Sequence, residues 1–263
     1  MNKKFIASAI AGLGLAASGS ASAIVVGGVD FGAAGLLSHL ETTTVAETFI
    51  SGNGQQLLGY GQVNTVNGNL FYGSGSDRLY FVFDQYVSND YTFTTVDFSA
   101  GQVRVYLMPT FNLLAQDSAT NFGLIDTGTP WAVLEGHGLF GTTDTLASNG
   151  QFTGDVISFS GAGLLDVVGG EADVVAFLDS DGIGDGAGGF ADIAITTSGD
   201  NAVLNPFDNT DGCTTGDAVE GQWCIAGSAD LRGLTTVPEP GVLALVGLGL
   251  LGMGVSLRKR KSA

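Results

Sequence analysis

The sequence predicts an all-β protein, folded as an antiparallel β-sandwich or a jelly-roll-like domain. Two observations favour this fold class. The region from residue 24 to residue 236 is rich in Gly, Thr, Ser, Asn and Asp, and it is poor in the long, straight side chains that favour helices. Its apolar runs are short and are bounded by turn residues, which is typical of many short strands at near-regular spacing.

Six segments have the composition of strands. Residues 78–86 (RLYFVFDQY) are apolar on both faces, whereas residues 102–108 alternate, with Val103, Val105 and Leu107 on one side. Four further strands are predicted at residues 91–98, 155–160, 174–178 and 190–196. Turns between the strands are predicted at Asn67-Gly68, Ser88-Asn89-Asp90 and Ser148-Asn149-Gly150.

One segment, from Gly35 to Phe49, has a helical pattern, although its run Thr42–Thr44 disfavours a helix. The glycine-rich stretch 182–189 is interpreted as a loop rather than a linker between domains, because strand-like sequence resumes at Phe190. The region 24–236 is long enough for one sizeable domain or two small ones. We treat it as an acidic, β-rich extracellular domain.

The N-terminus has the three parts of a secretory signal. Lys3 and Lys4 give a basic start, residues 5–15 form a short apolar run, and Ala21-Ser22-Ala23 supplies the small residues of a cleavage site. The alternative is a membrane anchor, but the apolar run is too short to span about 30 Å of hydrocarbon. Residues 1–23 are therefore predicted to be a cleaved signal peptide.

The C-terminus, residues 237–263, also has three parts. Pro238-Glu239-Pro240 precedes an uncharged apolar run from Gly241 to Leu257, and a basic cluster follows at residues 258–261. The apolar run is near the lower limit for a spanning helix, and its basic end should stay in the cytoplasm. We expect a transmembrane helix that leaves the main body of the chain outside. The alternative is an ordinary anchor that is never cut.

This tail resembles the PEP-CTERM sorting tail, in which Pro238, Glu239 and Pro240 are the motif. The resemblance implies that an integral-membrane exosortase recognises the tail and removes it. It also implies an exported protein of a Gram-negative bacterium that makes extracellular polysaccharide, held transiently at the inner membrane before processing. These implications concern a destination at the cell surface or in the extracellular matrix. They do not specify a biochemical activity.

The region between the two ends is strongly acidic. It contains three arginines, no lysine and 25 of the 26 acidic residues, which gives a formal charge of −22. Such a chain is repelled by phosphate backbones and anionic lipid, so nucleic-acid binding is excluded. The charge should attract divalent cations, although a solubilising acidic surface is a sufficient explanation for it.

The two cysteines, Cys213 and Cys224, are predicted to form a disulfide. An exported chain folds in an oxidising compartment, and a bridge closing so small a loop stabilises a protein by about 2–3 kcal/mol. A metal site at the cysteines would need further ligands, and no histidine lies near them in the sequence.

A calcium site is predicted in the segment DSDGIGD, with Asp179, Asp181 and Asp185 as its ligands. Glycine permits tight curvature while aspartate supplies the oxygen ligands that a hard cation prefers. The segment resembles the Asp-rich loops of extracellular calcium-binding repeats, and it departs from the EF-hand pattern. The alternative is a plain turn that binds no ion. No other cofactor is expected.

No catalytic signature stands out in the chain. Asp126-Thr127-Gly128 matches the loop of aspartic proteases, but that chemistry needs a second carboxylate and no second Asp-Thr/Ser-Gly occurs. His39 and His137 are the only histidines, and neither has metal-ligand spacing or a G-x-S-x-G partner motif. Trp131 and Trp223 suit either sugar stacking or core packing. We expect a protein that is not an enzyme.

The segment from Gly75 to Pro109 (GSDRLYFVFD … VRVYLMP) resembles flocculation-associated PEP-CTERM proteins. That resemblance implies a surface or matrix protein that holds cells and extracellular polysaccharide together as flocs or biofilm. Two alternatives stay open: a secreted hydrolase that acts on the polysaccharide, and a calcium-dependent carbohydrate-binding module.

Overall fold

The computed structural model describes residues 23–32, 37–153, 156–201 and 220–236. Most of the predicted signal peptide, Cys213 and the whole of Pro238-Glu239-Pro240 lie outside these residues, so the signal, the disulfide with Cys224 and the sorting helix stay predictions. The described elements are β1 (Val25–Val26), β2 (Val29–Asp30), β3 (Leu37–Thr48), β4 (Gln56–Gln62), β5 (Thr65–Val66), β6 (Asp77–Asn89), β7 (Thr95–Pro109), α2 (Ser118–Ile125), β8 (Ala132–His137), β9 (Asp144–Thr153), β10 (Val156–Gly170), α3 (Ala172–Leu178), β11 (Ile183–Gly184), β12 (Phe190–Ala191), β13 (Ile193–Asp200) and β14 (Trp223–Thr236).

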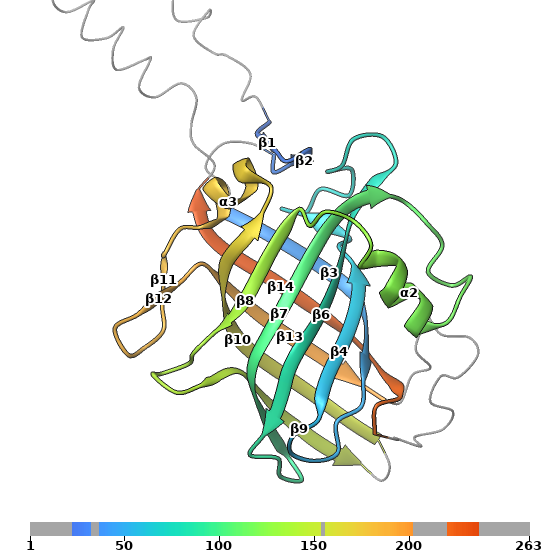
Figure 1. Cartoon of the computed structure of the whole chain (residues 1–263), viewed down its shortest axis with the longest axis vertical. Coiled ribbons are helices and arrows are strands. Elements are labelled where there is room, and N and C mark those ends of the chain that lie inside the picture. Colours follow the sequence, from blue (N-terminus) through green and yellow to red (C-terminus); the bar gives the residue numbers. More distant parts are fainter. Residues whose placement is uncertain (1–22, 33–36, 154–155, 202–219, 237–263) are drawn as a thin grey trace, which may run out of the picture.

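The main sheet is antiparallel and closes on itself (Figure 1). Its strands follow the order β13, β14, β3, β4, β6, β7, β8 and β10, and β10 pairs again with β13 over residues 158–165 and 193–200. β9 extends the wall beside the short β8, because it pairs with both β7 and β10. The predicted all-β antiparallel class is confirmed. The predicted sandwich or jelly roll is wrong, because one closed, barrel-like sheet encloses the core instead of two stacked sheets.

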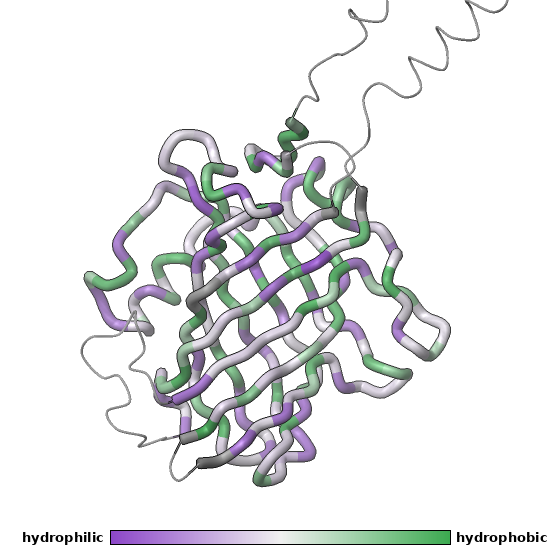
Figure 2. Tube along the Cα trace, turned by 180° about the vertical axis from the view of Figure 1, so that it is seen from behind, coloured by the Kyte–Doolittle hydropathy of each residue, from purple (hydrophilic) through white to green (hydrophobic). Residues whose placement is uncertain are grey.

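The strands alternate between the interior and the outer face, as the hydropathy along the trace shows (Figure 2). In β6, Leu79 and Phe81 belong to the interior core, whereas Tyr80 and Val82 face outward. The outward pair is buried beneath α2, which packs over it through Ile125. Residues 78–86 are therefore apolar on both faces because a helix covers this part of the outer surface.

Several predicted elements agree with the structure. Residues 78–86 and 102–108 lie inside β6 and β7, residues 156–160 begin β10, and 190–196 fall in β12 and β13. The Asn67-Gly68 turn is also present, with both residues at positive φ. The predicted strand at 91–98 begins only at Thr95.

Two predicted elements are wrong, and one segment with a helical pattern is a strand. Residues 174–178 are helical in α3, where Val174 and Leu178 lie one turn apart and are both buried; a short apolar run does not distinguish helix from strand. The segment 35–49 has a helical pattern that its threonines disfavour, and it contains β3, a strand placed between β14 and β4. Ser148-Asn149-Gly150 lies within β9 instead of forming a turn.

One end of the closed sheet is covered by β1, β2 and α3 (Figure 1). Trp131 lies there, 1 % exposed, and its indole Nε1 donates to the carbonyl oxygen of Gly27 at 2.9 Å. Phe31 stacks on Trp131, and Phe177 of α3 packs against Phe31. A Cβ at Gly27 would lie 2.4 Å from the indole nitrogen, so only glycine fits. Trp131 is therefore a core residue, which agrees with core packing and not with sugar stacking.

Among the described residues, one glutamate is buried in the interior: Glu47 of β3, which is 5 % exposed. It lies opposite Gly59 of β4 and Ile225 of β14, neither of which offers a side chain that could bond to it. Within the described residues its carboxyl makes no side-chain hydrogen bond. Burial without a partner raises the pKa of Glu47 from its ordinary value of 4.5 to about 7.

The buried carboxyl of Glu47 should make stability depend on pH. The pKa of Glu47 is higher in the folded state than in the unfolded state. Ionisation of Glu47 therefore does not affect the free energy of unfolding below pH 4.5, and it lowers that free energy progressively as the pH rises to about 7. Above that pH the folded state is destabilised by about 3 kcal/mol. Glu47→Gln should therefore gain about 3 kcal/mol over wild type between pH 4 and pH 8, measured by urea unfolding.

The matched control is Glu41→Gln, which removes a half-exposed carboxyl from the outer face of the same strand. We expect no comparable pH-dependent gain from it. A difference between Glu47→Gln and wild type that is the same at both pH values would contradict the burial of an ionisable Glu47.

Candidate functional site

Three carboxylates, Asp179, Asp181 and Asp192, each place an oxygen within 4.8 Å of the others. Asp179 caps the C-terminus of α3, Asp181 follows at a positive φ of 45°, and Asp192 lies between β12 and β13. The structure thus brings together two of the three predicted calcium ligands. The third member of the group is Asp192 and not Asp185.

Asp192 differs from Asp179 and Asp181 because it is buried and both of its carboxylate oxygens accept hydrogen bonds. Its Oδ1 accepts hydrogen bonds from the backbone N–H groups of Ser180 and Asp181, both at 2.7 Å, and its Oδ2 accepts one from Val167 at 2.8 Å. Asp192 therefore holds the loop in place, whereas Asp179 and Asp181 are exposed. Calcium prefers about six to eight oxygen ligands, so this group would supply only part of a shell, and calcium binding stays a prediction.

Asp185 closes the next turn of the same loop. One of its carboxylate oxygens accepts the backbone N–H groups of Ala187, Gly188 and Gly189 at 2.7–2.9 Å. These hydrogen bonds lower the pKa of Asp185. Its other oxygen faces Nε2 of His137 at 3.6 Å. Asp185 is thus committed to a turn and an ion pair, which explains why it does not join Asp179 and Asp181.

His137, at the end of β8, lies between two carboxylates. Its Nδ1 is 2.8 Å from an oxygen of Asp166 on β10, and its Nε2 faces Asp185. Burial lowers the pKa of His137, but hydrogen bonds and charge from Asp166 and Asp185 outweigh burial, so the net pKa is raised. Both ring nitrogens are therefore occupied in linking β8, β10 and the 185–189 loop.

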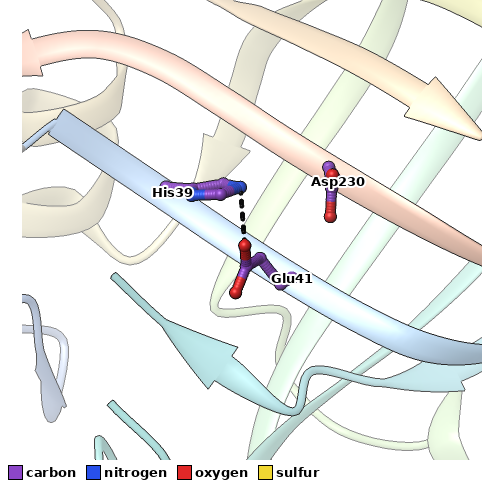
Figure 3. A group of neighbouring side chains, drawn as sticks. All are labelled: His39, Glu41 and Asp230. Carbon is purple, nitrogen blue, oxygen red and sulfur yellow. Dashed lines mark ion pairs between the residues drawn. The ribbon is translucent and has the colours of Figure 1, made fainter. Parts of the chain in front are cut away.

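A second group with metal-binding potential lies on the outer face of β3 and β14 (Figure 3). Strand pairing places His39 opposite Arg232 and Glu41 opposite Asp230. Nε2 of His39 lies 3.5 Å from Glu41, whose other oxygen accepts the hydroxyl of Thr65 at 2.6 Å. One imidazole and two carboxylates suit a borderline cation such as Zn²⁺. The sequence could not indicate this group, because its members meet only through long-range pairing.

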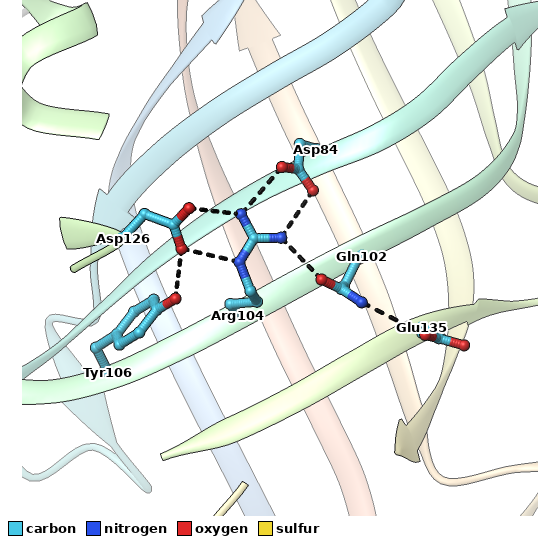
Figure 4. A network of polar contacts seen from close by, with 6 residues as sticks. All are labelled: Asp84, Gln102, Arg104, Tyr106, Asp126 and Glu135. Carbon is cyan, nitrogen blue, oxygen red and sulfur yellow. Dashed lines mark hydrogen bonds and ion pairs between the residues drawn. The ribbon is translucent and has the colours of Figure 1, made fainter. Parts of the chain in front are cut away.

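Arg104 of β7 is the centre of a polar network on the outer face (Figure 4). Its guanidinium binds both oxygens of Asp126 and both oxygens of Asp84 at 2.9–3.0 Å. It also donates to Gln102 at 2.8 Å. Asp126 caps the C-terminus of α2, so the network fastens this helix to the sheet.

Asp126 is also the aspartate of the protease-like Asp126-Thr127-Gly128. Burial raises the pKa of Asp126, but hydrogen bonds from Arg104 and from the hydroxyl of Tyr106 outweigh burial and hold the pKa below its usual value. A carboxylate ionised in this way cannot share a proton as the aspartic-protease pair does. Asp126 in the protease-like triplet therefore serves as the C-terminal cap of α2.

The family comparison identifies the C-terminal segment. Residues 236–261 match the family described as the PEP-CTERM protein-sorting motif. The chain carries this motif. The resemblance stated from Pro238-Glu239-Pro240 is thereby confirmed.

The PEP-CTERM motif is the exosortase recognition signal, and it implies export to the cell surface or the extracellular space. Neither a curated protein nor a solved structure matches the chain. Among the residues that the structure describes, no helix has both the length and the apolar character needed to cross a membrane.

Replacing Arg104 with leucine should destabilise the fold. The substitution leaves Asp84 and Asp126 facing each other without a counter-ion, at sites with 22 % and 30 % side-chain exposure. We expect a loss of about 2 kcal/mol in the free energy of unfolding, less than for a fully buried pair because solvent screens the charges. Arg232→Leu is the control, because Arg232 is 62 % exposed and makes one ion pair at 3.4 Å. Its effect should be within about 0.5 kcal/mol. Equal losses in the two variants would refute the role given to Arg104.

Calcium should stabilise the protein through Asp179 and Asp181. A ligand bound only by the folded state raises the melting temperature, by about 3 °C at ten times the dissociation constant. Magnesium is the control for charge screening of the acidic chain. Asp181→Asn should abolish the calcium-specific part, whereas Glu135→Gln, which removes the same charge elsewhere, should retain it. Equal shifts with both ions, unaffected by Asp181→Asn, would count against a site.

Proposed function

We propose that this chain is a surface or matrix protein without enzymatic activity. After exosortase processing it associates with extracellular polysaccharide and supports the formation of flocs or biofilm. The observation that carries the proposal is the sorting motif at residues 236–261, attached to an acidic domain. The resemblance of residues 75–109 to flocculation-associated proteins supports the same role.

The distribution of charge suggests how such an association works. A domain of charge −22 is repelled by an acidic polymer unless cations lie between them. The exposed carboxylates of Asp179 and Asp181, and the outer-face group of His39, Glu41 and Asp230, are places where a divalent cation gains several oxygen ligands. We therefore propose cation bridging between these carboxylates and the polymer.

The contacts of the reactive side chains support a non-enzymatic role. Asp126, in the protease-like triplet, is held by Arg104 and Tyr106. His137 is held on both ring nitrogens by Asp166 and Asp185. Each of these groups already has a structural partner, so the proposal assigns them to the stability of the fold.

Deleting the gene should weaken cell aggregation without stopping polysaccharide synthesis. Adding the exported protein to the deletion strain should restore aggregation, and a chelator should abolish the restored aggregation if cations form the bridge. The measurements are floc sedimentation and total extracted polymer. Normal aggregation in the deletion strain would refute the proposal.

Polymer incubated with purified protein separates this proposal from a secreted hydrolase. In size-exclusion chromatography, the matrix protein should elute with the polymer and leave the polymer's own size unchanged after the protein is removed. Shortened polymer, together with longer chains in the deletion strain, would establish the hydrolase instead.

A further inference from the structure

An apolar cavity of about 110 Å³ lies inside the closed sheet, in the half that faces away from β1, β2 and α3. Its walls are mainly aromatic and aliphatic, with Phe49, Phe81, Phe83, Phe98, Leu146 and Phe159 among them. The loop between β6 and β7 also lines it, and Phe93 in that loop is 70 % exposed. The cavity therefore extends from the core toward the end of the sheet opposite β1, β2 and α3.

Two polar side chains in the cavity wall lack hydrogen-bond partners within the described part of the chain. Tyr86 is 2 % exposed and its hydroxyl is unpaired. Glu47 is the second, and its carboxyl also makes no side-chain hydrogen bond there. Buried polar groups in folded proteins are nearly always paired, and an unpaired group destabilises the fold. Two such groups around one cavity point to a ligand that pairs with them.

The backbone is shaped to place Tyr86 in this position. Gln85 adopts a positive φ of 63°, and the register between β6 and β4 shifts from Phe83↔Gly59 to Tyr86↔Leu57, so two residues of β6 lie opposite one residue of β4. This is a β-bulge, which redirects the side chain that follows it. Gly101 lies under the Tyr86 ring, where a Cβ would come within 2.2 Å of a ring carbon. The tyrosine is thus turned inward over a glycine.

Room for the rest of the site is made in a similar way. Gly59 of β4 lies between Glu47 and Phe83 on the neighbouring strands. A Cβ at Gly59 would lie 1.9 Å from the Phe83 ring. The missing side chain lets Phe83 lie flat against the wall instead of filling the space beside Glu47.

We propose that this cavity binds a small, uncharged apolar molecule with one hydroxyl or carbonyl group, which hydrogen-bonds to Glu47 or Tyr86. The aromatic wall suits a ring or a short aliphatic chain. The volume is of the order of the roughly 150 Å³ apolar cavity that accepts benzene. A hydroxyl or carbonyl can pair with a protonated carboxyl or a phenol, whereas an anionic head group would be desolvated beside Glu47 without a counter-charge.

The ligand site is independent of the proposed role in the matrix. Its groups lie inside the sheet, whereas the carboxylates assigned to cation bridging lie on the outside. An apolar ligand would also not change the charge that the protein presents to a polymer. Either proposal can therefore fail without the other.

The test uses three probes of one size: benzyl alcohol, toluene and benzoate. Binding to the exported protein recovered from cells is measured by calorimetry at pH 6, where Glu47 is mainly protonated. We expect benzyl alcohol to bind about tenfold more tightly than toluene, the equivalent of one hydrogen bond. Benzoate should bind at least tenfold more weakly than benzyl alcohol.

The double variant Glu47→Leu with Tyr86→Phe separates the polar contacts from the cavity itself. It removes only unpaired polar atoms, so the fold should be retained, and toluene should still bind while the advantage of benzyl alcohol disappears. Tyr80→Phe is the control. Tyr80 faces outward, so the loss of its hydroxyl should leave the affinities for all three probes unchanged.

Three results would overturn the proposal. The first is that neither benzyl alcohol nor toluene binds at millimolar concentration. The second is that the double variant keeps the preference for benzyl alcohol. The third is that benzoate binds as tightly as benzyl alcohol.

Discussion

The pairing of β10 with β13 is the contact on which the rest of the structure depends. Eight consecutive residue pairs, from Ser158↔Asp200 to Leu165↔Ile193, join strands that would otherwise be edges of the sheet. Closing the sheet satisfies their backbone groups and encloses an interior that β1, β2 and α3 cover at one end. An open sheet of the same strands would have neither an enclosed cavity nor a defined end for these elements to cap.

The closed sheet also sorts the charged groups. On the outer face, the few basic side chains lie between pairs of carboxylates. Arg104 lies between Asp84 and Asp126, and His137 lies between Asp166 and Asp185. Repulsion within an acidic chain is thereby reduced at points that join separate elements. In the interior, Glu47 has no such partner, and burial shifts its pKa instead. The fold tolerates that cost beside a cavity that can admit a polar atom.

The sequence predicted what is local and left open what is long-range. The sorting motif is a contiguous signal, so Pro238-Glu239-Pro240 could be identified without a structure. The strands at 78–86 and 102–108 could be predicted from hydropathy, but sheet closure depends on pairing that no periodicity encodes. For the same reason the sequence did not indicate Asp192, which lies beside Asp179 and Asp181 only because β13 returns next to the loop. It also did not indicate the group of His39, Glu41 and Asp230, whose members lie on paired strands. The roles of Gly59 and Gly101 depend on the rings above them.

Amide-resolved hydrogen exchange of Ile193–Asp200 tests the closure of the sheet most directly. In the closed sheet β13 has a partner on both sides, so every backbone N–H of its central residues should be protected. If β13 were an edge strand paired with β14 alone, its N–H groups would point alternately toward β14 and toward solvent. Uniform protection along β13 is the result that closure predicts. Rapid exchange at every second residue would contradict it.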